Sequence, residues 1–253
     1  MPAWRLITTF GATPEFNMGL DEALLSTPGL PPTVRFYTWK PDTLSLGYFQ
    51  RLADVPGAER AGAIVRRITG GGAIHHVREL TFSITADQSL EVYAAGVRES
   101  YARVHRAIAR ALSEFGVEAE LRGESPLVSD REHTGMCFHH STALDLAWEG
   151  RKGVGSAQRR TGGRVLHHGS IKLGTSALEG DIATLSGPAS GPAAGTGARR
   201  ATVTPQDFAP VLRAAFEREF GARLEAAVPE RDERELAKEL GARYVSAEFV
   251  RSR

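Results

Sequence analysis

The residues of this chain that are best suited to do chemistry lie in one stretch, residues 137–173. It holds the only cysteine of the chain, Cys137, and a lysine in a short basic turn, Lys152. A lone thiol cannot form an internal disulfide. Cys137 is therefore either a small buried hydrophobe, the commoner fate of a free cysteine, or a nucleophile. Its polar neighbours, among them His139 and His140, favour a loop position. A nucleophile would need a nearby cation or base to stabilise the thiolate, and Lys152 can serve only if the fold brings the two together.

A second candidate motif, RRITGGGAIHH, occupies residues 66–76 between two predicted strands. Three consecutive glycines let the backbone approach a ligand closely, and the two arginines can pair with a phosphate or a carboxylate. A plain glycine hairpin with solvated arginines fits the spacing equally well. The motif is not a P-loop and not the GxGxxG dinucleotide fingerprint, because the residues that define those patterns do not follow the glycines.

Seven of the eight histidines lie near these two motifs, six of them in the pairs 75–76, 139–140 and 167–168. Imidazole and thiolate are both zinc donors. However, adjacent residues of a strand point to opposite faces, so each pair would supply one ligand at most. Neither CxxC nor HExxH spacing occurs. We therefore expect supporting histidines and no metal site.

The composition predicts a globular protein with a sizeable core. The chain has 253 residues, 42% of them hydrophobic and 24% charged, enough to bury one large core. A formal net charge of +1 gives no reason to expect nucleic acid or an anionic membrane as partner. One cysteine argues against a secreted disulfide scaffold. No segment resembles a signal peptide or approaches the ~20 apolar residues of a membrane span. We expect a cytoplasmic protein.

The hydrophobic pattern predicts an α+β architecture with mixed strands rather than a doubly wound sheet. Strands are expected over residues 4–9, 33–38, 43–48, 63–67, 80–86, 117–121, 144–148, 153–158 and 164–171, the second and third of them paired across a turn at Pro41. Helices are expected to begin at the Thr13-Pro14 and Thr204-Pro205 signals and to cover residues 91–115 and 233–240. Residues 186–200 are predicted to be a mobile small-residue loop. No repeat or linker interrupts the chain, so one domain over residues 1–253, with C-terminal helices in 204–253, is expected.

Several motifs in a fixed order carry a specific resemblance. RRITGGGAIHH followed by ELTFSI, then GRKGVGSAQ and HHGSIKL, resembles the lipoate–protein ligase and octanoyltransferase family, which is related to the biotin–protein ligase catalytic domain. The segments FNMGLDEALL and TVRFYTWKPDTLSLGYFQ extend the likeness over most of residues 4–175. The resemblance implies a mixed, largely antiparallel central sheet flanked by helices.

Two chemistries occur in that family. The Cys137-Phe138 pair, shortly before the GRK segment, resembles the nucleophile position of the cysteine-dependent octanoyltransferase that works with the glycine cleavage H protein. Such an enzyme takes octanoyl from acyl carrier protein onto the cysteine and passes it to a lysine of a lipoyl domain, in the H protein or in a 2-oxoacid dehydrogenase E2. It requires no cofactor. The alternative is a lipoate–protein ligase that uses ATP and Mg to form an acyl-adenylate. A non-catalytic protein that binds lipoyl carriers is a more distant option.

The resemblance also implies roles for single residues. Cys137 would carry the acyl chain as a thioester, and Lys152 would hold the acyl carbonyl and assist proton transfer. The last role requires a lysine pKa lowered from ~10.4, by partial burial or by a cationic neighbour such as Arg151. The family often has aspartate after the histidine of the glycine motif, where this chain has Val77. The substrate channel is expected to be lined by Arg66, Arg67, Gly70, Gly71, Gly72 and His76 on one side, and by Ser156, Gln158, His168 and Gly169 on the other.

Overall fold

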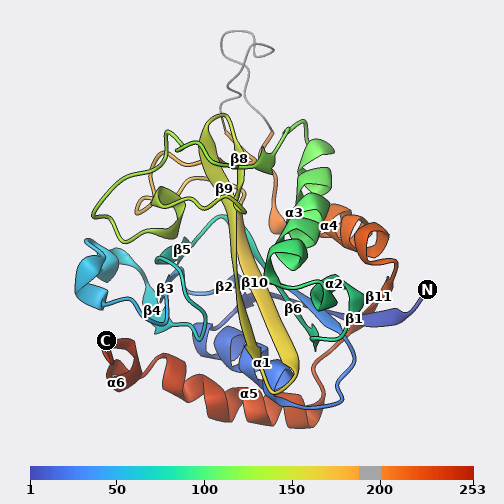
Figure 1. Cartoon of the computed structure of the whole chain (residues 1–253). Helices are drawn as coiled ribbons and strands as arrows, with labels where there is room; N and C mark the ends of the chain where they lie inside the picture. The colour runs from blue at the N-terminus through green and yellow to red at the C-terminus, as the bar shows by residue number, and fades with distance from the viewer. Residues whose placement is uncertain (188–200) are drawn as a thin grey trace.

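A computed structural model gives the fold of the chain and describes residues 1–187 and 201–253. The expected loop at residues 186–200 lies almost wholly outside the described residues. The centre of the fold is an eight-stranded mixed sheet with the strand order β11-β1-β2-β6-β10-β9-β8-β7 (Figure 1). β1 runs parallel to β2 and β11, and all other neighbouring pairs are antiparallel. This confirms the α+β class with a largely antiparallel sheet. The strands are β1 (Ala3–Ala12), β2 (Thr33–Trp39), β6 (Glu79–Asp87), β7 (Glu120–Leu121), β8 (Leu146–Trp148), β9 (Arg151–Thr161), β10 (Arg164–Lys172) and β11 (Arg223–Ala227).

A second, three-stranded sheet departs from the predicted pairing. β3 (Thr43–Leu46) lies between β4 (Ala63–Arg66) and β5 (Ile74–His76). The predicted hairpin between residues 33–38 and 43–48 is wrong, because β3 pairs with β4 and β5 instead of β2. Short 3-10 turns, Leu52–Asp54 and Ala58–Arg60, link β3 to β4. The small sheet therefore places residues 66–76, the glycine motif, beside the main sheet.

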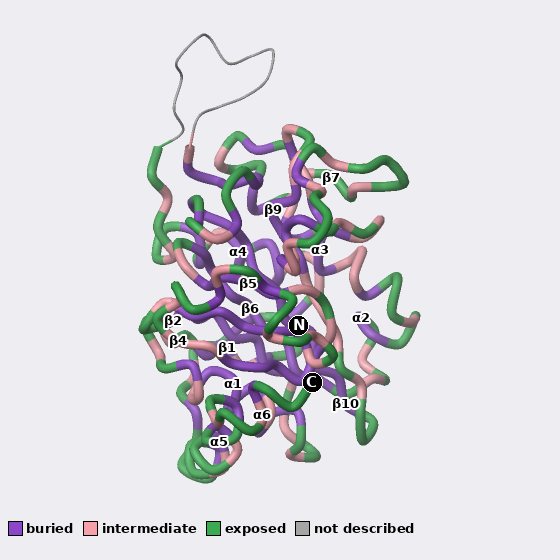
Figure 2. The backbone as a smooth tube through the Cα atoms, turned by 90° about the vertical axis from the view of Figure 1, so that its left-hand side faces the viewer, coloured by how far each residue is buried: buried purple, intermediate pink, exposed green. Residues whose placement is uncertain are grey.

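Helices cover both faces of the main sheet. α3 (Val97–Ser113) and α4 (Pro205–Phe220) pack against one face, where Ile108, Phe208 and Phe216 join a core with Phe36 and Phe82. α1 (Pro14–Ser26) lies on the opposite face, and α5 (Arg231–Tyr244) packs outside it. Figure 2 shows α1 mostly buried between the sheet and the more exposed α5.

The two predicted helix starts at Thr13-Pro14 and Thr204-Pro205 are confirmed, whereas one predicted helix is interrupted. Thr13 and Thr204 cap α1 and α4 with their hydroxyls, as expected, and Gly221 ends α4 in the left-handed conformation. The single helix predicted over residues 91–115 is wrong. It divides into α2 (Glu91–Ala94) and α3 at Gly96, whose φ of +97° breaks the helical path.

The C-terminal part also differs from the expected run of helices. Strand β11 follows α4 and extends the main sheet beyond β1. The predicted segment 233–240 is the middle of the longer α5, and a short α6 (Ala247–Val250) follows. Within the described residues, no helix is both long enough and apolar enough to span a membrane.

Candidate active site

Cys137 begins a short 3-10 turn, Cys137–His139, that is joined to the glycine motif. The Cys137 amide donates to the Ala73 carbonyl at 2.7 Å, and the Ala73 amide donates to the Gly135 carbonyl at 2.8 Å. A Cβ on Gly72 would lie 2.8 Å from the Cys137 nitrogen. The glycine therefore allows a close approach, but to the backbone of the cysteine turn. The two motifs that the sequence singled out form one structural unit.

Lys152 lies beside Cys137, where a cation that stabilises the thiolate would have to lie. Its Nζ is 3.4 Å from Cys137 Sγ and also donates to the carbonyls of Cys137 at 3.0 Å and His140 at 3.1 Å. Nζ forms an ion pair with Asp145 Oδ2 at 2.9 Å. Sequence analysis did not single out Asp145, although an acid between Leu144 and Leu146 in a predicted strand was a signal of a buried partner.

The charge state of Lys152 differs from the expectation. Burial by itself disfavours the ammonium, but the charges of Cys137 and Asp145 and their hydrogen bonds outweigh it and raise the pKa of Lys152. The expected cationic neighbour, Arg151, instead pairs with the exposed Asp181. The expectation that the pKa of Lys152 is lowered is therefore wrong, and the resting Lys152 side chain is a buried ammonium.

Gly155 makes room for this pair on β9. A Cβ at Gly155 would lie 2.9 Å from Lys152 Cε, 3.2 Å from its Nζ and 3.5 Å from Cys137 Sγ. Gly155→Ala is expected to displace the ammonium and to lower the rate at which the Cys137 thiol reacts with an electrophile by about tenfold or more, because small misplacements of reacting groups are costly. Single-turnover kinetics would measure it. Thr161→Ala, at the exposed far end of β9, is the control, and a Gly155→Ala rate equal to the wild-type rate would contradict the argument.

A pocket that is partly open to solvent lies next to Cys137. Aromatic and aliphatic side chains of α1, β2 and β5 provide much of its wall, and residues of the glycine motif and of β9 and β10 complete it. The lining residues are Met18, Tyr37, Trp39, Ser45, Arg67, Gly70, Gly71, Ile74, His76, Thr81, Cys137, Gly155, Ser156, Ala157, His168 and Gly169.

The two arginines of the glycine motif have different positions. Arg67 lines the pocket, and its guanidinium binds the backbone carbonyls of Ser45, Gly70 and Gly72. Arg66 points away from the pocket and binds five backbone carbonyls, in the loop after β3 and in α6. Both arginines hold the shape of the surrounding loops. Only Arg67 is placed where it could touch a substrate.

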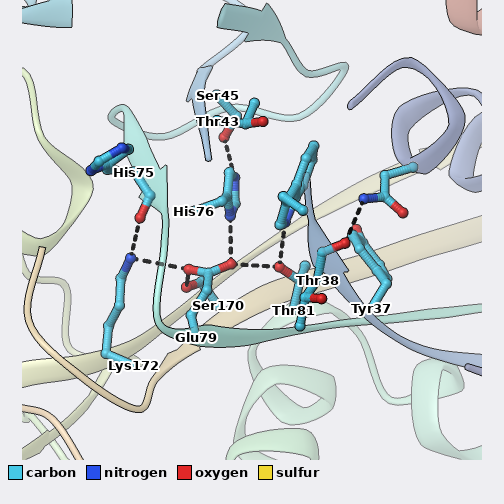
Figure 3. A network of polar contacts seen from close by, with 12 residues as sticks. Tyr37, Thr38, Thr43, Ser45, His75, His76, Glu79, Thr81, Ser170 and Lys172 are labelled. Carbon is cyan, nitrogen blue, oxygen red and sulfur yellow. Dashed lines mark hydrogen bonds and ion pairs between the residues drawn. The ribbon is translucent and has the colours of Figure 1, made fainter. Parts of the chain in front are cut away.

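His76 belongs to a buried polar network centred on Glu79 (Figure 3). Glu79 Oε1 is 2.5 Å from His76 Nδ1, and Ser45 Oγ is 2.8 Å from His76 Nε2. Burial lowers the pKa of His76, so the ring is neutral near pH 7. Nδ1–H then donates to the carboxylate, and the Ser45 hydroxyl donates to Nε2. Glu79 thus supplies the carboxylate that Val77 lacks. Sequence analysis missed it, because it lies three residues away across a turn.

Glu79 is held as a carboxylate by the groups around it. It accepts hydrogen bonds from Thr81 at 2.6 Å and from Ser170, and Lys172 Nζ lies 3.0 Å from Oε2. Burial alone would raise the pKa of Glu79, but the hydrogen bonds from His76 and Ser170 and the charge of Lys172 overcome it and hold the pKa far below its usual range.

Glu79→Gln is expected to lower the free energy of unfolding at pH 7 by about 1–3 kcal/mol. Lys172 keeps Glu179 as a counter-charge at 2.8 Å, but an amide cannot accept all the hydrogen bonds that the Glu79 carboxylate accepts. A depressed folded-state pKa contributes stability above the unfolded value of ~4.3 that is lost as pH falls below it. The difference from wild type should therefore narrow below about pH 4.3. Urea unfolding at several pH values measures this. Glu91→Gln, an exposed carboxylate, should change stability by less than ~0.5 kcal/mol, and equal stability of Glu79→Gln and wild type would contradict the prediction.

Four residues of β9 and β10 were expected to line one side of the substrate channel, but not all of them face the pocket. His168 and Gly169 line it, with His168 Nε2 2.6 Å from Thr69 Oγ1. Ser156 also lines it, but its hydroxyl binds His105 and His167 on the side of α3. Gln158 lies outside the pocket and donates to Ser100 of α3.

The paired histidines point to opposite faces, as strand geometry predicted. His167 contacts Ser156 on the α3 side, whereas His168 faces Thr69 and Asp21. His75 binds Ser176 and Asp42, and His76 binds Glu79. Within residues 1–187 and 201–253, no three His, Cys, Asp or Glu side chains are grouped to hold a metal ion.

Comparison with known proteins places this site in a family. Residues 13–189 match the lipoyl protein ligase A/B catalytic domain. Octanoyltransferase LipM of Moorella thermoacetica is 42% identical over 190 residues, which cover 72% of this chain and 68% of that protein. Octanoyltransferase LipM of Kyrpidia tusciae is 34% identical over 98% of both chains. The structure of a bipartite lipoate protein ligase from Thermoplasma acidophilum, studied with its E2 lipoyl domain, has the same fold, with a TM-score of 0.71, 19% identity and coverage of 98% of this chain and 96% of that one.

The family match covers well over half of the chain, and one relative aligns along nearly its whole length. The matched residues, 13–189, include Cys137, Lys152 and the glycine motif. This chain therefore belongs to the lipoyl protein ligase A/B catalytic domain family and is an acyltransferase.

Proposed function

We propose that this enzyme transfers an octanoyl group from acyl carrier protein, through a thioester on Cys137, to a lysine of a lipoyl domain. Acceptors would be the glycine cleavage H protein or a 2-oxoacid dehydrogenase E2. The observation that carries the proposal is the 3.4 Å approach of Lys152 Nζ to Cys137 Sγ at the wall of a pocket. The names of the two relatives, octanoyltransferases both, support the choice of acyl group.

The pocket suits an acyl chain bound next to the thiol. Met18, Tyr37, Trp39 and Ile74 give it apolar walls, and each methylene buried there stabilises the complex by ~0.8 kcal/mol. Gly70 and Gly71 of the glycine motif, which line the pocket, would form the rim along which the carrier's thioester enters. One pocket thus holds both the tail and the reacting carbonyl.

The chemistry follows from a thiol next to an ammonium. In the first step the Cys137 sulfur forms a bond to the octanoyl carbonyl carbon, the carbon–sulfur bond to the carrier breaks, and the proton of Cys137 leaves with the carrier's sulfur as a thiol. Lys152 would stabilise the negative charge that develops on the carbonyl oxygen and on both sulfur atoms. In the second step a neutral lysine amine of the lipoyl domain attacks the acyl-cysteine, Cys137 departs, and the amine loses one proton to it. No nucleotide, metal or other cofactor enters either step.

The second candidate is an ATP-dependent lipoate–protein ligase. The bipartite ligase from T. acidophilum shares the fold, and in such an enzyme the same pocket would bind lipoate while the glycine motif faces the nucleotide. Lys152 could neutralise the acyl-adenylate in that reaction, but Cys137 would have no part in it. The position of Cys137 favours the transferase.

Intact-mass measurement on the purified protein tests the choice. With octanoyl–acyl carrier protein and no ATP, the wild type is expected to gain one octanoyl group, and peptide mapping should locate it on Cys137, the only cysteine. Addition of lipoyl-domain protein should then discharge it. Absence of the adduct, together with lipoyl-domain modification only when free lipoate, ATP and Mg are supplied, would establish the ligase instead. The cytoplasmic location expected from the sequence stays a prediction.

A further inference from the structure

We propose that Asp145 is a positioning residue that holds Lys152 beside Cys137 as a permanent ammonium, so that Lys152 acts as a fixed cation and not as a base. This inference rests on the proposed acyl transfer through Cys137. It adds a residue to the site and assigns the charge state in which its lysine works.

The contacts of Lys152 account for all of its hydrogens. Three oxygen atoms, of Asp145, Cys137 and His140, lie 2.9, 3.0 and 3.1 Å from Nζ. An ammonium has three N–H groups, so each has an oxygen acceptor, and the thiol sulfur at 3.4 Å is a fourth neighbour. A neutral amine would offer only two hydrogens, which is one too few for the three oxygen acceptors. Asp145 is the only one of these oxygen partners that carries a charge.

Asp145 is itself held on two sides. Its Oδ2 accepts from the Thr142 amide at 2.7 Å, in a turn closed by its own amide on the Thr142 carbonyl. The preceding carbonyl, of Leu144, lies 2.5 Å from His105 Nδ1 of α3. The side chain is 6% exposed. The carboxylate therefore cannot leave Lys152 for solvent without breaking these contacts.

A buried series of hydrogen bonds fixes the contact between His105 and the Leu144 carbonyl. A carbonyl only accepts, so His105 carries its proton on Nδ1, and its Nε2 accepts from the Ser156 hydroxyl at 2.8 Å. The Ser156 oxygen is then free to accept from His167 Nε2 at 3.0 Å, and His167 Nδ1 accepts from Gln158 at 3.2 Å. Burial lowers the pKa of both histidines, so each has the single proton that this direction requires. This series of hydrogen bonds connects the turn that holds Asp145 to α3, β9 and β10.

Other titratable groups around Lys152 leave Asp145 as its fixed counter-charge. His105 is neutral, and burial raises the pKa of Tyr101 to about 12. Arg67, which lines the pocket with Cys137, and Lys172 are cations and supply no counter-charge. The Phe138 ring lies 4.8 Å from Lys172 Nζ and 5.6 Å from Lys152 Nζ. Cys137 becomes a counter-charge only when it is a thiolate.

The experiment compares Asp145→Asn with wild type in the first half-reaction. The asparagine oxygen can still accept from Thr142 and Lys152, so the change removes charge and keeps shape. Rate constants for octanoylation of Cys137 by octanoyl–acyl carrier protein would be measured by quenched intact mass from pH 6.5 to 9.5. Without the carboxylate, burial is expected to lower the pKa of Lys152. The wild-type to variant rate ratio should therefore rise at least about tenfold across this range, while the half-saturating carrier concentration changes less than about threefold.

Two further proteins make the result decisive. Asp145→Glu keeps the charge and is expected to restore the wild-type pH profile even if its rate is lower. Arg151→Gln, next to Lys152 in sequence but paired with the exposed Asp181, should match wild type at every pH. A rate ratio that stays constant or falls with pH would overturn the proposal, as would a wild-type rate that itself drops between pH 7 and 8, a result that needs no folded variant. Failure of the proposed function is distinct, since wild type would then form no adduct at any pH.

Discussion

The Cys137→Ala protein is expected to lose octanoyl transfer from acyl carrier protein by at least ~10⁴-fold, because the covalent intermediate can no longer form. The fold should survive. Cys137 lies at the edge of a small cluster with Ile74, Phe138 and Ile182, and removal of one partly exposed sulfur should cost less than ~1.5 kcal/mol. Transfer to a lipoyl domain would be measured by mass, and stability by urea unfolding.

Cys137→Ser separates loss of the nucleophile from loss of binding. Serine can bind the acyl chain in the same pocket and, if it reacts, forms an ester that the acceptor lysine discharges slowly. A small, persistent octanoyl adduct is expected, against a rapidly turned-over adduct in wild type. His133→Asn is the control, because that side chain is 94% exposed and asparagine tolerates its φ of +58°. If Cys137→Ala keeps a tenth or more of wild-type transfer, the thioester mechanism is wrong.

The second large effect is expected at Lys152. Lys152→Met keeps an unbranched side chain only one atom shorter but removes the cation that faces the developing charges. The rate of Cys137 octanoylation should therefore fall by ~10²–10³-fold. It also leaves Asp145 as an unpaired buried carboxylate, which should cost about 3–5 kcal/mol of unfolding free energy. Stopped reactions analysed by mass and urea unfolding measure the two effects separately.

A double variant distinguishes chemistry from damage to the fold. In Lys152→Met/Asp145→Asn both buried charges are gone, so much of the lost stability should return. Catalysis should not return with it, because no cation faces the sulfur. Recovery of the acylation rate together with stability would mean that Lys152 serves the fold alone, contrary to the proposed mechanism.

Much of the fold could be predicted from local sequence because its signals are local. The hydrophobic pattern marked most strands of the main sheet, and Thr13-Pro14 and Thr204-Pro205 marked the starts of two helices. These signals depend on the geometry of a few neighbouring residues. Strand partners could not be predicted in the same way. Residues 43–48 have the pattern of a strand next to a turn, but a period of two does not specify which strand lies alongside, and β3 joined β4 and β5.

The same division applies to the candidate site. The sequence by itself determined the reactive types, a single thiol and a lysine in ordered motifs, because these are properties of the residues. Only the tertiary structure decided that the glycine motif binds the backbone of the cysteine turn, that Glu79 replaces the carboxylate missing at Val77, and that the Ser156 hydroxyl faces α3. It also decided the charge of Lys152. A lysine pKa depends on the balance between burial and nearby charge. Cys137 and Asp145 become the charges near Lys152 only when the cysteine turn and the start of β8 lie against β9.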